Sequence, residues 1–454
     1  MTNILTHNLA TVSAKGRLFT IVMIILTAAI VVDISFSFVP NLSELPTGLT
    51  YSTFLLLAFI FAISSFLAMR YIRQANKDVM VRLPKINNLH RFVEIVQYIL
   101  TAILILTALQ VVFTSKYATA SLITGSGIAY GLSIVVMVSL SALFLSWYKP
   151  NKNLVTLAYG LSSVVLSIAF SLLIVQNYSL LYGLPAERDS MSEPNQPFPN
   201  EIMYLAALSS AVGFFVLWFS TALLLNHYST KLGRIKFWTI MSIPIFLFVI
   251  QFTILPQVTA AYAATSTDLL SVILLGNVMP GVITGILFGM PFWVIQSTIK
   301  NDVIKKYMYI AAWGSALLQL TSIGGVYPAL YPPFGLYAVV LTGLACYLLL
   351  IGIYSSALTV SIDAKLRRLV RTYAIEKTKL IDVVGNAQMK KEIEGRVLEV
   401  SRRYSDDVLE ETGVHPSLTE PEVKLYIENV MQELTDYSHP SARRTEEGEQ
   451  KFKS

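Results

Sequence analysis

The chain contains 454 residues, of which 54% are hydrophobic and only 14% charged, and its mean hydropathy is +0.60. This composition lies well outside the range of soluble globular proteins and predicts an integral membrane protein. The net charge of +6 is modest for this length, so we expect the lipid bilayer, and no nucleic acid, to be the principal partner.

Ten apolar segments are long enough to cross a hydrocarbon core of about 30 Å, which takes about 20 helical residues. They predict an all-α fold, a polytopic transmembrane helix bundle with a helical cytoplasmic tail. The predicted spans are 17–39, 50–69, 92–114, 126–148, 154–177, 202–226, 238–256, 277–298, 307–326 and 336–359. Residues 257–276 are also apolar, and the sequence does not decide whether they belong to the membrane.

The basic residues divide unequally between the two sides of these spans. Before the tail, the segments on the side of the N-terminus hold sixteen Lys and Arg residues, whereas the opposite loops hold only Lys116 and Arg188. Because Lys and Arg are retained in cytoplasmic loops, we predict that both termini are cytoplasmic and that the protein lies in the plasma membrane. The chain then divides into a transmembrane bundle at 1–359, a cytoplasmic helical tail at 360–438 and a disordered C-terminus at 439–454.

The outer loop at 178–201 combines acidic residues with four prolines, which prevent a regular helix. It either binds a cation or a partner protein, or it is a solvated connector between two spans. We favour the connector, because outer loops are already expected to contain few basic residues, and an acidic loop needs no further explanation.

The chain shows no pattern typical of catalysis or of metal binding. The single cysteine, Cys346, lies inside the last predicted span, and all five histidines lie at span ends or in water: His7, His90, His227, His415 and His439. No pair of them is placed to ligate a haem or a metal within the bilayer. Since nucleophile–base spacing and a phosphate-binding loop are also missing from the sequence, we expect neither an enzyme nor a cofactor.

Asp33 is the one acidic residue well inside a predicted span. It precedes Pro40 by seven residues, so it lies about 10 Å from the outer end of its helix at about 1.5 Å per residue. An intramembrane carboxylate is a candidate for proton or cation handling. The alternative is a carboxylate that reaches the interface or bonds to Ser35 or Ser37. Glu94, near the inner end of its helix and close to Arg91, is predicted to be interfacial.

Three glycines recur every four residues in the eighth span: Gly281, Gly285 and Gly289. Glycines at this spacing let two helices approach closely, so we predict that they form a helix-packing face. Pro280 and Pro291 bracket them, and a broken helix lining a substrate cavity would use the same residue types. Packing is the interpretation that we favour.

The last span is predicted to continue into the tail as one helix, because no proline or glycine occurs between Gly352 and Gly385. Apolar residues then recur at heptad-like spacing, which predicts a coiled-coil-like seam for association. The candidate association residues are Leu366, Tyr373, Leu380 and Val384.

Part of the chain resembles a known group of proteins. The segments "YPPFG", "CYLLLIGIYSSALTVSIDAKLRRLVR", "AQMKKEIEGRV" and "EETGVHPSLTEPEVKLYIENV" are similar to those of uncharacterised multi-pass membrane proteins of ammonia-oxidising archaea. The resemblance covers roughly the last 130 residues. It implies an archaeal plasma membrane and carries over no functional residue.

Two classes of function fit these features. The first is a membrane sensor or signal-coupling protein, in which the tail recruits a cytoplasmic effector protein or forms a homo-oligomer. The second is a secondary transporter or channel for a small solute or ion, which the number of spans, Asp33 and the interrupted eighth span would suit. The continuous exit helix favours the sensor.

Overall fold

The computed structural model describes most of the apolar part of the chain. The described residues are 2–38, 47–76, 84–182, 187–189, 200–226, 233–254, 276, 278–299, 301–323 and 331–362, with short stretches between 384 and 399. Contacts divide the chain into two compact units, Met1–Val384 and Gly385–Ser454. The description below concerns the first unit.

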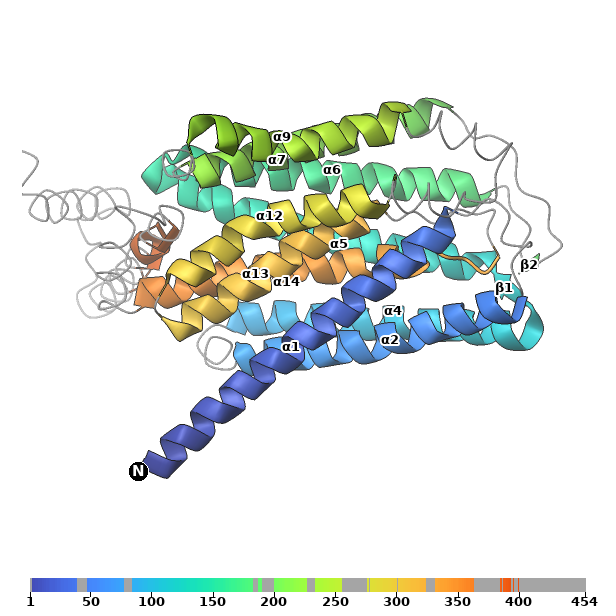
Figure 1. The fold of residues 1–454 in the computed structure, drawn as a ribbon, viewed down its shortest axis with the longest axis horizontal. Helices are drawn as coiled ribbons and strands as arrows, with labels where there is room; N and C mark the ends of the chain where they lie inside the picture. Colours follow the sequence, from blue (N-terminus) through green and yellow to red (C-terminus); the bar gives the residue numbers. More distant parts are fainter. Residues whose placement is uncertain are drawn as a thin grey trace, which may run out of the picture. The chain divides into compact units, whose positions relative to one another are not determined.

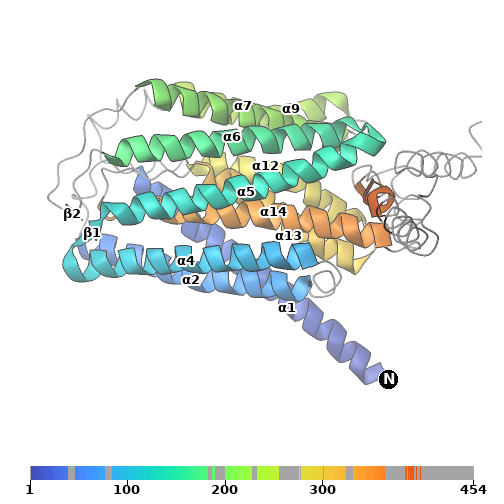
Figure 2. The same ribbon diagram turned by 180° about the vertical axis from the view of Figure 1, so that it is seen from behind.

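The first unit is a bundle of long helices that run alternately up and down, which confirms the predicted all-α fold (Figures 1 and 2). Its described elements, in chain order, are α1 (Thr2–Ser37), α2 (Thr47–Ala75), α4 (Pro84–Thr114), β1 (Lys116–Ala118), α5 (Thr119–Asn151), α6 (Leu154–Tyr182), β2 (Glu187–Asp189), α7 (Asn200–Leu225), α9 (Arg234–Val249), the π-helix η3 (Ile250–Ile254), α12 (Met279–Thr298), α13 (Asp302–Thr321) and α14 (Leu336–Ile362).

Eight of the ten predicted spans are confirmed as helices long and apolar enough to cross a membrane, among the residues that the structure describes. The other two, 238–256 and 307–326, coincide with α9 and α13. Helix α9 has only 16 residues and passes into η3, whereas α13 carries Asp302, Lys305 and Lys306 in its first turns. These features lower the apolar length of both helices. Residues 257–275 lie outside the described part of the chain.

Helix α14 is the central helix of this unit. It contacts α13, α5, α1, α4 and α2, and every residue from Leu336 to Ile353 is buried. A helix that is apolar on all sides lies either in a protein core or in lipid, and α14 lies among the other helices of the bundle (Figures 1 and 2). Over this stretch α14 therefore packs against neighbouring helices on all sides.

A short β-ladder joins two loops at the end of the bundle where α4 ends and α5 begins. Strands β1 and β2 are antiparallel, with Lys116 opposite Asp189 and Ala118 opposite Glu187. The sequence interpretation treated the segment around β2 as part of a connector and missed the ladder. Opposite charges across a strand pair contribute modestly to its stability, and nothing in the proline-rich sequence around β2 signals a strand.

Glycines bring α12, α13 and α14 into close contact. A Cβ atom added at Gly285 would lie 2.7 Å from the carbonyl oxygen of Ala316, and one at Gly289 would lie 2.9 Å from that of Ala312. Gly281 faces the side chain of Ile323 in the same interface. All three glycines of the predicted packing face therefore lie against α13, where van der Waals contact between backbones holds helices together in lipid.

Two further glycines, which the sequence analysis did not single out, allow α13 and α14 to approach closely. A Cβ atom at Gly314 would fall against the backbone nitrogen of Leu349, and one at Gly352 would lie 2.7 Å from the carbonyl oxygen of Tyr307. The three helices consequently form a layer in which backbones touch on both sides of α13.

Candidate functional site

Asp33 caps the start of α14. Its Oδ1 accepts a hydrogen bond of 2.8 Å from the backbone N–H of Gly335, and its Oδ2 accepts one of 2.9 Å from that of Ala338. The side chain is fully buried. The first N–H groups of a helix lack intrahelical acceptors, and a negative charge at that end also complements the helix dipole. Asp33 thus supplies from α1 the cap that α14 lacks in its own sequence.

This geometry bears on the two interpretations of Asp33. The hydroxyls of Ser35 and Ser37 bond instead to the carbonyl oxygens of Val31 and Ile34, so neither is the partner that the sequence suggested. The carboxylate does not reach an interface, because it is enclosed within the bundle. Both of its oxygens accept hydrogen bonds from the backbone of α14, as expected for a structural role.

Further contacts join the start of α14 to α2 and α1. The hydroxyl of Tyr337 donates a hydrogen bond of 2.9 Å to the carbonyl oxygen of Phe54. The ring of Phe334, directly before α14, stacks on Phe36 of α1 with 4.8 Å between centroids. Gly335 between these residues has a φ of +91°, a conformation that glycine adopts without strain. The start of α14 is therefore fixed to both α1 and α2.

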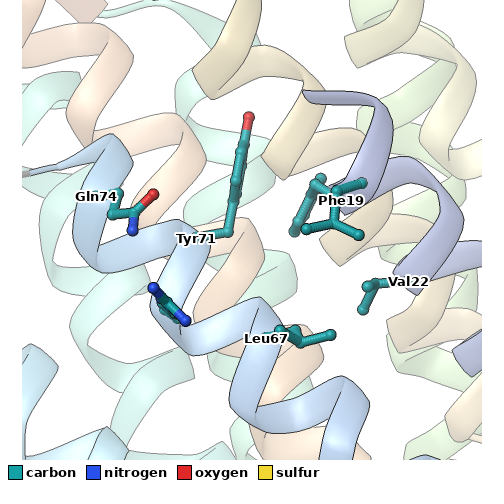
Figure 3. A pocket seen from close by; sticks show the side chains of 7 residues that line it. Phe19, Val22, Leu67, Tyr71 and Gln74 are labelled. Carbon is teal, nitrogen blue, oxygen red and sulfur yellow. The ribbon is translucent and has the colours of Figure 1, made fainter. Parts of the chain in front are cut away.

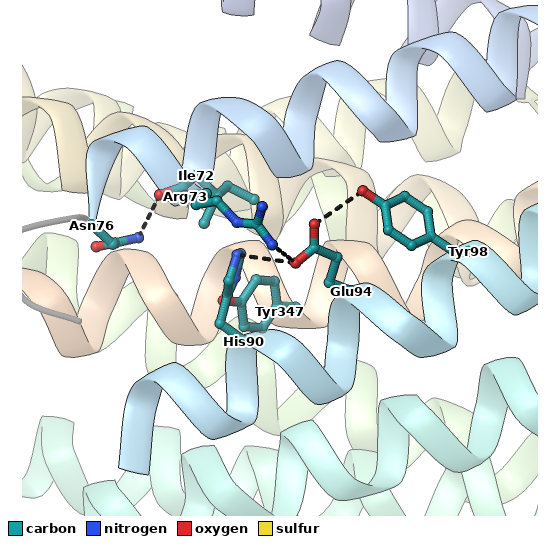
Figure 4. A network of polar contacts seen from close by, with 7 residues as sticks. All are labelled: Ile72, Arg73, Asn76, His90, Glu94, Tyr98 and Tyr347. Atoms are coloured by element: carbon teal, nitrogen blue, oxygen red, sulfur yellow. Dashed lines mark hydrogen bonds and ion pairs between the residues drawn. The ribbon is translucent and has the colours of Figure 1, made fainter. Parts of the chain in front are cut away.

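A polar cluster around the buried side chains of Glu94 and His90 lies near the end of α2 and the start of α4 (Figure 4). The guanidinium of Arg73 pairs with the Oε2 atom of Glu94, and the hydroxyl of Tyr98 donates a bond of 3.0 Å to Oε1. The side chain of Glu94 is only 10% exposed, whereas that of Arg73 is 58% exposed. The sequence predicted Glu94 to be interfacial and named no partner for it; the structure pairs the largely buried carboxylate with Arg73 of α2, while the nearby Arg91 is exposed.

His90 extends this cluster to α14. Its Nδ1 lies 2.7 Å from the hydroxyl of Tyr347, and its Nε2 lies 3.9 Å from Glu94 Oε2. If Tyr347 donates to Nδ1, the imidazole proton lies on Nε2 and faces the carboxylate. The sequence placed His90 at a span end, and the structure adds that it is 1% exposed. His90 therefore lies in the protein interior, not in water.

Asn76 forms the last link of the cluster. Its Oδ1 accepts a bond of 2.8 Å from the hydroxyl of Ser355 on α14, and its Nδ2 donates one of 3.2 Å to the carbonyl oxygen of Ile72. The amide therefore satisfies a carbonyl at the end of α2 and joins that end to α14. Helix α4 is thus hydrogen-bonded near the middle of the central helix, and the end of α2 to its second half.

Sequence reasoning missed this cluster, although a signal for it exists. His90, Glu94, Gln97 and Tyr98 recur at helical spacing and form a polar stripe on one face of the otherwise apolar α4. Gln97 is 1% exposed and neither of its amide atoms has a hydrogen-bond partner within the described residues. Buried polar groups usually have hydrogen-bond partners, so Gln97 stands out within this stripe.

The other candidate residues do not join this site. The glycines Gly281, Gly285 and Gly289 pack α12 against α13, away from the cluster. Of the predicted tail residues, Val384 is buried at 2% exposure, and Leu366, Tyr373 and Leu380 lie outside the described residues. Within the described part of the chain, no three His, Cys, Asp or Glu side chains form a group that could hold a metal ion.

A double-mutant cycle tests the Arg73–Glu94 pair. We expect Arg73→Ala to lower the free energy of unfolding by about 1 kcal/mol, because the Arg73 side chain is 58% exposed and solvent screens its attraction to Glu94. Combining it with Glu94→Gln should cost less than the sum of the single changes. The measurement is reversible unfolding in detergent micelles. As a matched control, Arg91→Ala should be additive with Glu94→Gln; additivity in both cycles would contradict the pairing.

Comparison of the chain with protein-family models, with curated proteins and with solved structures found no match. The functional argument therefore depends on the geometry of the bundle.

Proposed function

We propose that this multi-pass membrane protein couples a cue received by its helix bundle to an effector protein that its C-terminal segment recruits. The observation that carries the proposal is the attachment of α14. The central helix is bonded to α1 through Asp33, to α4 through Tyr347 and to α2 through Tyr337 and Ser355. It is also the last helix before the C-terminal segment.

These attachments support α14 as the transmitting element of the proposed coupling. A shift of α2 or α4 pulls on hydrogen bonds at Tyr347 and Ser355, whereas the Asp33 cap holds the other end of α14 to α1. Packed helices respond to such shifts as rigid units, with translations of about 1–2 Å. The sequence beyond Gly352 contains no proline or glycine up to Gly385, which favours helical continuation toward the tail. Association of two tails in a homo-oligomer would use the same connection.

The proposal is tested by an affinity pull-down from native membranes. The baits are the full chain, a chain that ends at Ile362, and a full chain carrying Tyr347→Phe and Ser355→Ala. We expect a partner that is captured by the full chain, lost on truncation, and bound several-fold more weakly or more strongly by the double variant. The exposed Ser242 bonds only to its own helix, so Ser242→Ala serves as the matched control.

Two results would overturn the coupling. One is the absence of any tail-dependent partner. The other is a tail-dependent partner whose capture by the folded double variant equals that of the control.

A second candidate function is transport, which the His90–Glu94–Arg73 cluster favours. Ionisable groups inside a membrane bundle are costly and often mark a path for protons or ions. If the protein transports a cation or protons, Glu94→Gln should abolish a pH-dependent flux in reconstituted vesicles, while Arg91→Ala leaves it intact. A wild-type protein that shows no flux in vesicles under a proton or cation gradient would exclude this candidate.

A further inference from the structure

A polar cavity of about 600 Å³ opens among α1, α2, α12 and α13. Its lining includes three basic side chains: Arg17 from α1 and Lys305 and Lys306 from α13. Gln74 of α2 and Gln296 of α12 add amide groups. Arg17 lies at the start of an apolar span, Gly16–Ser37, so the cavity is level with the end of the hydrocarbon region on the side predicted to be cytoplasmic.

The lining carries an excess of positive charge. Asp302 is its one acidic member, and its carboxylate lies 3.7 Å from Lys305 Nζ and is 84% exposed. Three cations against one anion leave a net charge of +2 around the cavity. Such a lining attracts an anion, and amide and ammonium donors match the oxygen acceptors of a phosphate group.

A largely apolar crevice of about 220 Å³ lies beside this cavity, and Figure 3 shows the side chains that line it. Leu18, Phe19 and Val22 of α1 and Leu67 of α2 line it, together with Arg70, which adds a further positive charge. Tyr71 and Gln74 line both spaces, so the crevice and the cavity lie side by side and share these two side chains as a wall. In Figure 3 the side chains of Phe19, Val22 and Leu67 border one gap between α1 and α2, with Tyr71 at its end.

The walls where the two spaces meet are held in place by contacts between helices. Phe19 stacks on Tyr71 with 4.3 Å between ring centroids, and Lys306 Nζ lies 5.5 Å from the Tyr71 ring centroid. Thr20 Oγ1 and the Tyr309 hydroxyl are hydrogen-bonded at 2.9 Å. These contacts join α1, α2 and α13, so little ordering is required when a ligand binds.

We infer that this composite space binds one anionic phospholipid, with the phosphate headgroup in the basic cavity and an acyl chain along the apolar crevice. A soluble phosphate would use the cavity but would leave the crevice empty. The apolar crevice lies toward the membrane interior, and the cations lie at its end. A phospholipid in a bilayer has the same order, with its apolar chains inside and its phosphate headgroup at the surface. The inference does not depend on the proposed coupling function.

Lipid retention by the purified protein tests the inference. The full chain is reconstituted with phosphatidylglycerol or with phosphatidylcholine of the same acyl chains, and bound lipid is counted by native mass spectrometry. We expect selective retention of phosphatidylglycerol. Lys305→Gln with Lys306→Gln should weaken it about tenfold or more, because each basic group near the surface contributes about 1 kcal/mol. A second variant, Arg17→Gln with Lys305→Gln, leaves the Lys306–Tyr71 contact intact and should act in the same direction.

Controls distinguish the lipid from other ligands. Lys236 is an exposed lysine of α9 that does not line either space, so Lys236→Gln should retain phosphatidylglycerol as the unaltered chain does. Adding inorganic phosphate in excess should not displace the lipid. Equal retention of the two lipids, an unchanged affinity in both basic-site variants, or displacement by inorganic phosphate would each overturn the inference.

Discussion

Replacing Gly314 with alanine should destabilise the bundle strongly. The added Cβ atom would fall against the backbone nitrogen of Leu349 and would lie 2.8 Å from the carbonyl carbon of Leu348. Backbone atoms cannot move aside as a flexible side chain can, so α13 and α14 must separate. Forced separation of this kind costs about 1–3 kcal/mol, and occasionally more. We expect a cost at or above the upper end of that range, because α14 is enclosed on all sides and cannot shift alone.

The measurement is the midpoint of thermal unfolding in detergent, together with monodispersity on gel filtration. Gly131, in the middle of α5, has nothing within 4 Å of an added Cβ, so Gly131→Ala is the matched control and should be neutral or slightly stabilising, since alanine favours helix more than glycine does. If Gly314→Ala unfolds at the same temperature as Gly131→Ala, the close approach of α13 and α14 is wrong.

The contrast between the two sets of glycines shows what a sequence pattern can and cannot predict. Gly281, Gly285 and Gly289 repeat every four residues, so their common face is visible in the sequence. Gly314 and Gly352 each occur without such a repeat in their helices. They matter because the backbone of an adjacent helix passes close to them. Which helix does so depends on the tertiary arrangement.

The same limit applies to the polar groups. Hydropathy predicts the helices well, because a span is a local property of about 20 residues. A hydrogen-bond partner is not local: Asp33 is joined to Gly335, and His90 to Tyr347, across most of the length of the bundle sequence. The sequence therefore marked Asp33 as unusual but not as a helix cap, and it did not pair His90 with Tyr347.

Replacing Asp33 with asparagine should also cost substantial stability. An amide side chain has one acceptor oxygen, so it can serve either the Gly335 N–H or the Ala338 N–H, while its NH₂ group faces the other. A buried donor left without an acceptor costs about 1–3 kcal/mol. Asp302→Asn is the matched control. That carboxylate is 84% exposed, and its loss should change the unfolding midpoint little.

The same variant separates a structural Asp33 from an ion-handling one. If the carboxylate acts only as the cap of α14, Asp33→Asn lowers the unfolding temperature, and whatever fraction folds keeps any cation or pH response of the reconstituted protein. If the carboxylate takes up protons or cations, the response disappears while the unfolding temperature stays near that of the Asp302→Asn control. We expect the first result, because both carboxylate oxygens already accept backbone hydrogen bonds and neither is exposed to an incoming ion.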